Sequence, residues 1–469
     1  MRTREVGTLT LTGLVLSNLR GLRRKYAAFL FSGVLSILVF YLLASFVLHP
    51  DVVNGHVAQA QTVRRGLMVS QCIIVAFTVF FVLYSSWAFV KSRKKEFGLL
   101  CLFGATKSQV RWLIVVEHVV VGAIGVGVGL GLGIPLSKLM LDSMSRLLGV
   151  WSPVRFMMVV PAVKLTAALF MALFLLAGAL AAMQVSPRKV VRLLREHQRP
   201  RDIPSCSVPL VVLSLLCIGG GYGAAWVVDG STLGAAMLPV TSVVSLGTFL
   251  FFAQVSVAIL GALRRRPAFL YTGLNLLTVG DLSFRMKENA WVLATVAVLS
   301  AAVITSMGTI YTARAMILMS VEEYAPEAQA GVYQEMKQTV ALTAMIALLM
   351  TGLFFIAAGS MLYFRLFGEA EEDREKYRAM RKLGVSSQEI ARVVTAQVLV
   401  FFFAPIVVGS IHCAFAMKSL SNVLRADWPF LGVYRYALGA IAGFSLVQAV
   451  YFLAARRAYL KEVVEASAG

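Results

Sequence analysis

The sequence predicts an all-α integral membrane protein, and three observations support this class. Hydrophobic residues make up 59% of the 469 residues and charged residues only 14%, a balance that excludes an ordinary soluble chain of this length. About ten apolar segments are long enough to cross a bilayer, which requires roughly 20 residues per helix. Basic residues gather in the loops on one side of these segments, as the positive-inside rule describes.

The chain opens with a predicted N-terminal amphipathic helix, residues 1–25, that would lie along the inner membrane surface. Ten predicted spans follow in a four, two and four arrangement, at 26–48, 66–90, 109–135, 160–183, 208–228, 236–261, 289–311, 337–364, 390–417 and 431–455. They define a first four-helix module (26–185), a linker with a central pair of spans (186–288), and a second four-helix module (289–469).

Orientation follows from the basic clusters, which lie at 20–25, 91–95, 188–201, 264–266 and 374–382. If these clusters are on the inner side, ten spans return the C-terminus to the side of the N-terminus. The first long apolar run has the length of a span, so no cleaved signal peptide is expected. We therefore expect a multi-pass protein of the cell membrane with both termini in the cytoplasm.

Several function classes are excluded by what the residues lack. The net charge is +21, but the basic residues occupy short loops rather than one face, so nucleic acid is not an expected partner. The five cysteines are scattered, which predicts neither a disulfide framework nor a metal site. The string GATKS at Gly104 lacks the second glycine of a P-loop. We expect no enzyme activity and no cofactor in this chain.

Two stretches of the sequence look like copies of one structural motif. The first is KSRKKEFGLLCLFGATKSQVRWLIVVEHVVVG from Lys91, and the second is EEDREKYRAMRKLGVSSQEIARVVTAQVLVFFFAPIVVG from Glu371. Without a gap, Phe97 aligns with Tyr377, Gly104 with Gly384, Thr106 with Ser386, and Val110 with Ile390. We call them the first elbow (residues 91–110) and the second elbow (371–390).

Each elbow is predicted to be a short helix held outside the membrane between two spans. Its charged start is too polar for hydrocarbon, and its glycine, Gly104 or Gly384, can adopt the positive φ that ends a helix. Thr106 and Ser386 can then cap the next helix. One such loop alone would be an ordinary basic inner loop. Two copies at the same spacing favour a docking element, in keeping with paired repeats in transporter folds.

These motifs resemble the FtsX-like permease module of ABC transporters. The second copy, followed by a span with Pro405 and Ile411–His412, is similar to the bacitracin-resistance (Bce-type) branch, which also has the four, two and four arrangement. The resemblance implies a permease coupled to a cytoplasmic ABC ATPase dimer, which would bind ATP and Mg, with a sensor histidine kinase as a further partner. The implied ATPase-coupling residues are Phe97, Gly98, Leu99, Leu100, Phe103, Gly104, Thr106, Tyr377, Met380, Leu383, Gly384 and Ser386.

One departure from that branch concerns the outer side. Members usually carry a large extracellular domain between spans seven and eight, where this chain has only the short stretch 312–335. We therefore expect a lipidic or lipid-linked substrate that enters from the outer leaflet. Candidate contacts are the basic residues Lys138, Arg146, Arg155, Lys164, Arg425 and Arg435. The alternative is that these side chains only reach toward lipid headgroups, since membrane lipids are expected partners in any case.

Two ionisable residues fall inside predicted spans, where such groups are often functional. For Glu117 the favoured interpretation is a structural pair with Arg111 or a basic residue of the elbow. For His412 the alternatives are a functional role and a simple hydrogen bond to a neighbouring carbonyl. The sequence leaves three functions open: a permease for antimicrobial-peptide resistance or lipid-linked envelope substrates; an FtsX-like permease for lipoprotein release, peptide export or cell-wall regulation; and, last, a gradient-driven secondary transporter.

Overall fold

The computed structural model describes residues 23–50, 60–148, 156–184, 205–323, 330–368, 370–424 and 432–465. Within these ranges the chain is helical and contains no strand, and ten helices are long and apolar enough to cross a membrane. The ten predicted spans and the all-α membrane class are therefore confirmed. The predicted N-terminal amphipathic helix lies almost wholly outside the described residues, and its last positions, from Arg23, already belong to the first span helix.

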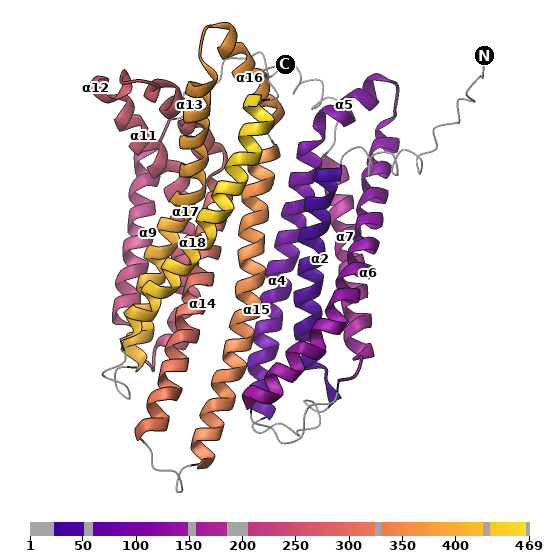
Figure 1. Ribbon diagram of the computed structural model, residues 1–469, viewed down its shortest axis with the longest axis vertical. Helices are drawn as coiled ribbons and strands as arrows, with labels where there is room; N and C mark the ends of the chain where they lie inside the picture. Colours follow the sequence, from indigo (N-terminus) through magenta and orange to yellow (C-terminus); the bar gives the residue numbers. More distant parts are fainter. Residues whose placement is uncertain are drawn as a thin grey trace, which may run out of the picture. The chain divides into compact units, whose positions relative to one another are not determined.

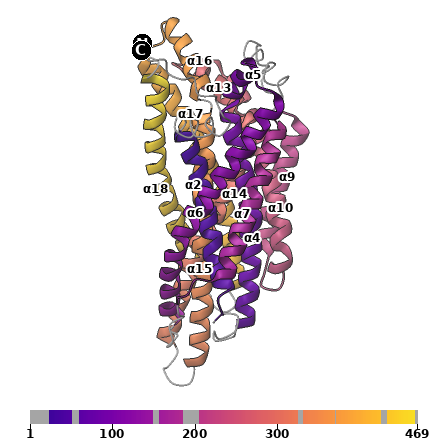
Figure 2. The same cartoon turned by 90° about the vertical axis from the view of Figure 1, so that its right-hand side faces the viewer.

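The chain forms two compact units, Met1–Pro200 and Arg201–Gly469. In the first unit the helices are α2 (Arg23–Val47), α4 (Ala60–Ser92), α5 (Lys94–Leu102), α6 (Lys107–Leu148) and α7 (Val160–Gln184). The helix α2 packs against α4, α6 and α7, so the four long helices enclose one apolar core (Figure 2). Phe29, Phe89 and Phe174 meet there as stacked and edge-to-face rings, geometries that aromatic pairs prefer.

The second unit contains the central pair of spans as well as the second repeat. Its elements are α9 (Val208–Val227), α10 (Leu233–Leu250), η1 (Phe251–Val255), α11 (Ser256–Arg264), α12 (Pro267–Leu270), α13 (Asn275–Glu288), α14 (Ala290–Glu323), α15 (Ala330–Gly368), α16 (Ala370–Lys382), α17 (Ser387–Leu424), α18 (Val433–Leu460) and η2 (Lys461–Glu465) (Figure 1). The helix α14 packs against α15, α17 and α18, while α9 contacts α17 and α10 contacts α14.

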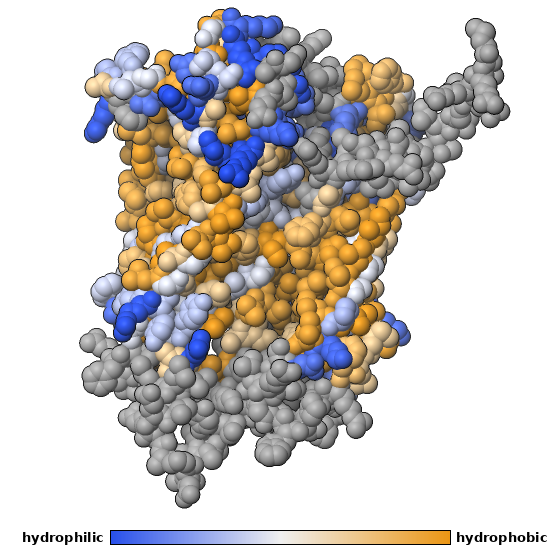
Figure 3. Space-filling view, in the orientation of Figure 1, coloured by the Kyte–Doolittle hydropathy of each residue, from blue (hydrophilic) through white to orange (hydrophobic). Residues whose placement is uncertain are grey.

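Apolar side chains cover the flanks of the second unit's long helices, whereas the end that carries α16 is hydrophilic (Figure 3). The helix α9 illustrates the flank, since Val212, Leu216 and Val227 are exposed along a segment that has almost no buried positions. Hydrocarbon is the solvent that such a surface requires, because exposing it to water would be unfavourable. The distribution agrees with a protein that spans a membrane many times.

Two of the predicted span ends lie inside longer helices. The third span is predicted to end at residue 135, but α6 continues through Pro135 as far as Leu148. Similarly, α14 continues to Glu323, well beyond the predicted end of span seven at 311. The predicted ends are too early because polar residues mark where a helix leaves the hydrocarbon, whereas the helix itself can continue beyond that point. Both extensions are rich in residues that favour helix, such as leucine, methionine and alanine.

The glycines of α6 allow two helices to approach closely. A Cβ added to Gly129 would lie 2.6 Å from Cγ2 of Ile37, and one added to Gly133 would lie 2.7 Å from a ring carbon of Tyr41. Close approach of this kind is the usual use of small residues in membrane helices. These two glycines therefore serve the packing of α6 against α2.

Candidate functional site

The two elbows have the same backbone. The helices α5 and α16 end at the aligned residues Leu102 and Lys382, and Gly104 and Gly384 have φ of 91° and 92°. In the first elbow, the N–H of Ala105 donates to the carbonyl of Leu100 at 3.0 Å. The corresponding bond in the second elbow joins residues 385 and 380. Each turn is a Schellman motif, whose glycine must be left-handed, so the predicted turn is confirmed.

Each elbow starts its next helix with a capping box. The hydroxyl of Thr106 accepts from the N–H of Gln109 at 3.3 Å, and the Gln109 side chain accepts from the N–H of Thr106 at 2.8 Å. Ser386 and Glu389 repeat both bonds at 3.3 and 2.9 Å. Two backbone donors are thus satisfied at each helix start. The caps Thr106 and Ser386 were predicted, whereas the returning side chains of Gln109 and Glu389 were not.

A buried arginine holds the first elbow together. The side chain of Arg93 is only 1% exposed, and its Nη1 donates to Glu117 at 2.5 Å and to the hydroxyl of Tyr26 at 2.7 Å. Its Nε donates to Glu96 at 2.7 Å, and its guanidinium lies 5.0 Å from the ring centre of Phe97. Such a cation is tolerated because it is paired, hydrogen-bonded and placed over aromatic faces.

These contacts decide the role of Glu117. Its partner is Arg93, a basic residue of the elbow, rather than Arg111. Arg93 joins α2, α5 and α6 through its three partners, Tyr26, Glu96 and Glu117.

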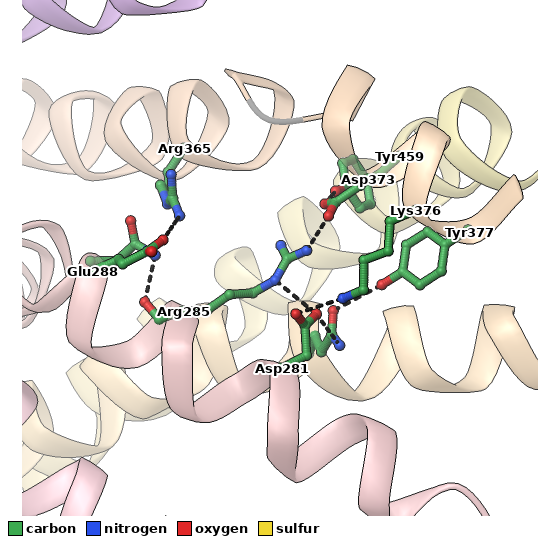
Figure 4. Close-up of polar contacts among 10 residues, drawn as sticks. Asp281, Arg285, Glu288, Arg365, Asp373, Lys376, Tyr377 and Tyr459 are labelled. Atoms are coloured by element: carbon green, nitrogen blue, oxygen red, sulfur yellow. Dashed lines mark hydrogen bonds and ion pairs between the residues drawn. The ribbon is translucent and has the colours of Figure 1, made fainter. Parts of the chain in front are cut away.

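In the second elbow the buried charges are reversed. Asp373 occupies the position aligned with Arg93, and its two carboxylate oxygens accept from Arg285 of α13 and from the hydroxyl of Tyr459 of α18 (Figure 4). Arg285 also pairs with Asp281, one helical turn earlier, at 3.1 Å. Burial disfavours the charge of Arg285, but the two carboxylates outweigh that effect and raise its pKa. Arg285 is therefore permanently charged.

A glutamine stands where the first elbow has Glu117. Gln397 of α17 donates to Asp281 at 2.8 Å and accepts from the hydroxyl of Tyr377 at 3.3 Å. Lys376 closes the group through an ion pair of 2.6 Å with the other oxygen of Asp281 (Figure 4). Burial raises the pKa of Tyr377, and the charge of Asp373 adds to the effect. Tyr377 is therefore a neutral hydrogen-bond donor inside the cluster.

The two aligned aromatics lie inside the elbows. Phe97 and Tyr377 are each only 1% exposed and face the buried charges, and Gly98 is also buried. The cations Arg93 and Lys376 lie over the two rings. Their shared aromatic character serves the interior of the elbow.

The outward faces are different. At the tip of the first elbow, Leu99, Leu102 and Phe103 are 53%, 68% and 86% exposed. The aligned tip of the second elbow is formed by Ala379, Lys382 and Leu383, and Leu383 is 85% exposed. Of the predicted coupling residues, Leu100 and Met380 are half-buried, while Gly104, Thr106, Gly384 and Ser386 are exposed. Leu102 was missed, although helical spacing places it with Leu99 on the face opposite Phe97.

His412 links the central pair of spans to α17. Its Nδ1 lies 2.6 Å from the Tyr222 hydroxyl, and its Nε2 lies 2.8 Å from the Thr248 hydroxyl. Because Thr248 already donates to the carbonyl of Val244 at 2.7 Å, Nε2 donates to Thr248, and Nδ1 accepts from Tyr222. Of the two alternatives for His412, the structure does not contain the bond to a carbonyl; the partners shown are two hydroxyls, one from α9 and one from α10.

Among the candidate outer residues, Lys138 on α6, Lys164 on α7 and Arg435 on α18 are exposed. Arg155 and Arg425 lie outside the described residues, and Arg146 belongs to the part of α6 whose side chains are not described. The exposure of the first three agrees both with substrate contact and with headgroup contact.

Residues 68–189 match the family model described as FtsX-like permease C-terminal. That stretch contains the first elbow, most of α4, and all of α6 and α7. The chain therefore contains an FtsX-like permease domain, the class that the repeated elbows had indicated.

Known relatives extend this class to most of the chain. The uncharacterized ABC transporter permease YvcS of Bacillus subtilis is 24% identical over 649 positions, covering 97% of this chain and 100% of the relative. The ABC transporter permease protein YxdM of the same organism is 24% identical, covering 94% and 97%. The bacitracin export permease protein BceB of Bacillus subtilis is 23% identical, covering 65% of this chain and 48% of its own length.

The chain thus contains an FtsX-like permease domain and is similar over most of its length to ABC transporter permeases. The alignment with YvcS has 649 positions, more than the 469 residues here, so that relative contains insertions that this chain lacks. In this structure, α14 ends at Glu323 and α15 begins at Ala330. Only residues 324–329 therefore lie between the two helices that contain spans seven and eight.

Proposed function

We propose that this chain is the membrane subunit through which a separate ATPase dimer drives the handling or export of cell-envelope substrates, and that both elbows dock onto that ATPase. ABC permeases work with a cytoplasmic ATPase. The supporting observation is the first elbow, which exposes Leu102 and Phe103 outside any candidate span. Large apolar side chains exposed beside charged ones are typical of protein interaction sites.

The construction of the elbow supports transmission of force as well as docking. Behind the exposed tip, Arg93 ties the short helix to α2 and α6 through buried polar contacts. A helix attached in this way cannot move without moving the spans beneath it. A force applied by an ATPase bound at Leu102 and Phe103 would thus be transmitted directly to the membrane helices.

The docking proposal is tested by co-purification of the ATPase that is encoded with the permease. The double substitution Leu102→Glu with Phe103→Glu places two charges on the tip, and we expect the ATPase to be lost from the purified complex. Tyr271→Glu is the matched control, because Tyr271 is 75% exposed but belongs to neither elbow. Full retention of the ATPase by the double variant, at a normal amount of permease, would overturn the proposal.

The proposal also places both elbows and both termini in the cytoplasm. A cysteine at Arg266, in the exposed segment after α11, should then resist a membrane-impermeant thiol reagent in intact cells. It should react once the membrane is permeabilised. Rapid labelling in intact cells would place the elbows on the outer side and contradict ATPase docking.

For the substrate we propose an antimicrobial peptide or a lipid-linked molecule that approaches from the outer leaflet. The relative named as a bacitracin export permease supports a peptide of this kind. The short connection 324–329 supports recognition within the membrane rather than by a domain at that place. The exposed Lys164 could then meet phosphate groups through charge-assisted hydrogen bonds.

The double substitution Arg155→Gln with Lys164→Gln tests this second step. We expect weaker peptide resistance, or weaker stimulation of the complex's ATPase by lipid-linked substrate, at unchanged abundance. If both remain normal, the two residues serve only as membrane anchors. ATPase co-purification should be unaffected in either case, which keeps the substrate proposal separate from the docking proposal.

A further inference from the structure

The helix α13 connects the second elbow to the sixth span. It is a short helix of 14 residues, and Val279, Leu282 and Met286 form its buried face. It packs against α11, η1 and α17. Since α10, η1 and α11 together form the sixth span, from Ala235 to Arg264, α13 is directly in contact with that span along its apolar side.

The other side of α13 bears the charges that hold α16. Asp281 and Arg285 of α13 meet Asp373 and Lys376 of α16, so that two acidic and two basic side chains balance. Every oxygen of the two carboxylates has a partner: Lys376 and Arg285 on Asp281, and Arg285 and Tyr459 on Asp373. Only Arg285 bridges both carboxylates (Figure 4).

Such a cluster is a rigid joint rather than a loose surface contact. The exposed fractions are 16% for the Arg285 side chain and 7% for that of Asp373. Removal of one member would leave its partners charged and poorly solvated, which strongly opposes separation of the two helices. Movement of α16 is therefore transmitted to α13.

The sixth span has an irregular turn where α13 meets it. The segment η1 (Phe251–Val255) is a π-helical turn that interrupts the α-helix between α10 and α11. Turns of this kind are rare and frequently mark functional sites. Both this π-helical turn and α11 contact α13.

We propose that α13 is a strut that carries displacement of the second elbow to the sixth span, with Arg285 as the positioning residue that fastens the strut to α16. The inference rests on the proposed docking of the ATPase to the elbows. Through α13, an ATPase bound to α16 would act on the central pair of spans as well as on its own repeat. The joint lies entirely within the second unit.

The test measures whether α16 and α11 move together. Spin labels at positions 378 and 265, both exposed, report the distance between α16 and the end of the sixth span in the permease–ATPase complex. The native cysteines are replaced by serine beforehand. With Arg285 present, we expect the distance to stay the same when ATP hydrolysis is trapped with vanadate. In Arg285→Met, we expect trapping to shift the distance.

Three further measurements separate this role from simple misfolding and from failure of docking. Arg266→Met is the matched control, since Arg266 is exposed and outside the cluster, and it should behave like the parent protein. Arg285→Lys keeps a positive charge beside Asp281 and Asp373 and should shift the distance less than Arg285→Met does. Co-purification of the ATPase should persist in Arg285→Met, because the strut lies behind the docking surface.

Two results would overturn the inference. The first is a distance between labels 378 and 265 that changes on vanadate trapping as much in the parent protein as in Arg285→Met. The other is a distance that remains constant in Arg285→Met, in a complex that still binds and hydrolyses ATP. Absence of the ATPase from the parent complex would instead refute the proposed docking, so the two proposals fail in different ways.

Discussion

The first and second elbows share a backbone but are stabilised by opposite buried charges. Both have the glycine turn and the capping box at aligned residues. At one aligned position, however, the first elbow buries Arg93 and the second buries Asp373. At another, Glu117 is matched by Gln397. Local backbone chemistry is thus common to the repeats, whereas the way each elbow is fastened to its surroundings is not.

This difference shows which parts of the protein stabilise each elbow. Arg93 is satisfied by Glu96, Glu117 and Tyr26, all within the first four spans or their connections. Asp373 instead depends on Arg285 from α13 and on Tyr459. A reversed charge therefore changes which helix must follow the elbow when it moves.

The largest effect is expected where a fully buried ion pair loses its cation. Arg93→Met removes the guanidinium that joins Tyr26, Glu96 and Glu117 and should lower the free energy of unfolding by about 3–5 kcal/mol. Asp373→Asn should cost less, about 1.5–3 kcal/mol, because Arg285 keeps Asp281. Thermal unfolding of the purified protein in detergent measures both.

A double substitution provides the control for that comparison. Arg93→Met with Glu117→Leu removes both charges and should recover most of the loss, since an apolar pair of similar volume replaces a buried ion pair at little cost. Equal destabilisation by Arg93→Met and Asp373→Asn would show that the two clusters do not differ in the way their contacts indicate.

The glycine turns should respond identically. Gly104→Ala and Gly384→Ala each force a side chain into the left-handed region, with no neighbouring atom within 4 Å to add a clash. Each should lower the free energy of unfolding by roughly 1–2 kcal/mol. Gly280→Ala, in the helix α13, is the control and should stabilise instead, by up to about 1 kcal/mol. A clear difference between Gly104→Ala and Gly384→Ala would break the equivalence of the turns.

The capping boxes should show a smaller and nearly equal effect. Thr106→Ala and Ser386→Ala each remove one acceptor at a helix start, which typically costs about 1 kcal/mol. Gln109→Glu brings the first box closer to the second and adds a negative charge at a helix N-terminus, which should stabilise by roughly 0.3–1 kcal/mol. The same unfolding measurement applies, and loss of stability in Gln109→Glu would contradict this account.

The smallest expected effect is a dependence on acid that belongs to the second elbow. Burial raises the pKa of Asp281, but the charges of Arg285 and Lys376 outweigh it and hold the pKa below its usual value. The stabilisation that the Asp281 carboxylate contributes is therefore fully present above the pKa of an unfolded aspartate, about 3.9. It is lost as the pH falls through the lower pKa of Asp281 in the folded protein. Between pH 5 and about 3, the parent protein should lose more thermal stability than Asp281→Asn. An equal loss of thermal stability in the parent protein and in Asp281→Asn would show that Asp281 does not cause the acid dependence.

Much of the fold follows from local pattern. Apolar length identified the spans, and the repeated glycine and hydroxyl residues identified both elbows, because these signals act over a few residues. The helical extension after Pro135 could not be predicted from polarity, since leaving hydrocarbon does not end a helix. The exposed Leu102 could have been found from helical spacing alone.

The support of the second elbow is a long-range property. Asp281 and Arg285 lie about ninety residues before Asp373 in the chain, and no periodicity connects them. One signal was present in the aligned copies: an aspartate occupies the place of a buried arginine, which requires a cation from elsewhere. The sequence could predict the need for that cation, but only the ion pairs between α13 and α16 identify it as Arg285.

The long helices that leave the elbows also determine the amplitude of any motion. The helices α6 and α17 begin at their capping boxes and continue for 42 and 38 residues. At 1.5 Å per residue, each is a lever of about 60 Å, and a tilt of about 5° at the capped end displaces the other end by roughly 5 Å. The prolines Pro135 and Pro405 lie at different depths along these levers, and each removes a backbone hydrogen bond. Equal rotations at the two elbows therefore produce unequal displacements at the opposite ends.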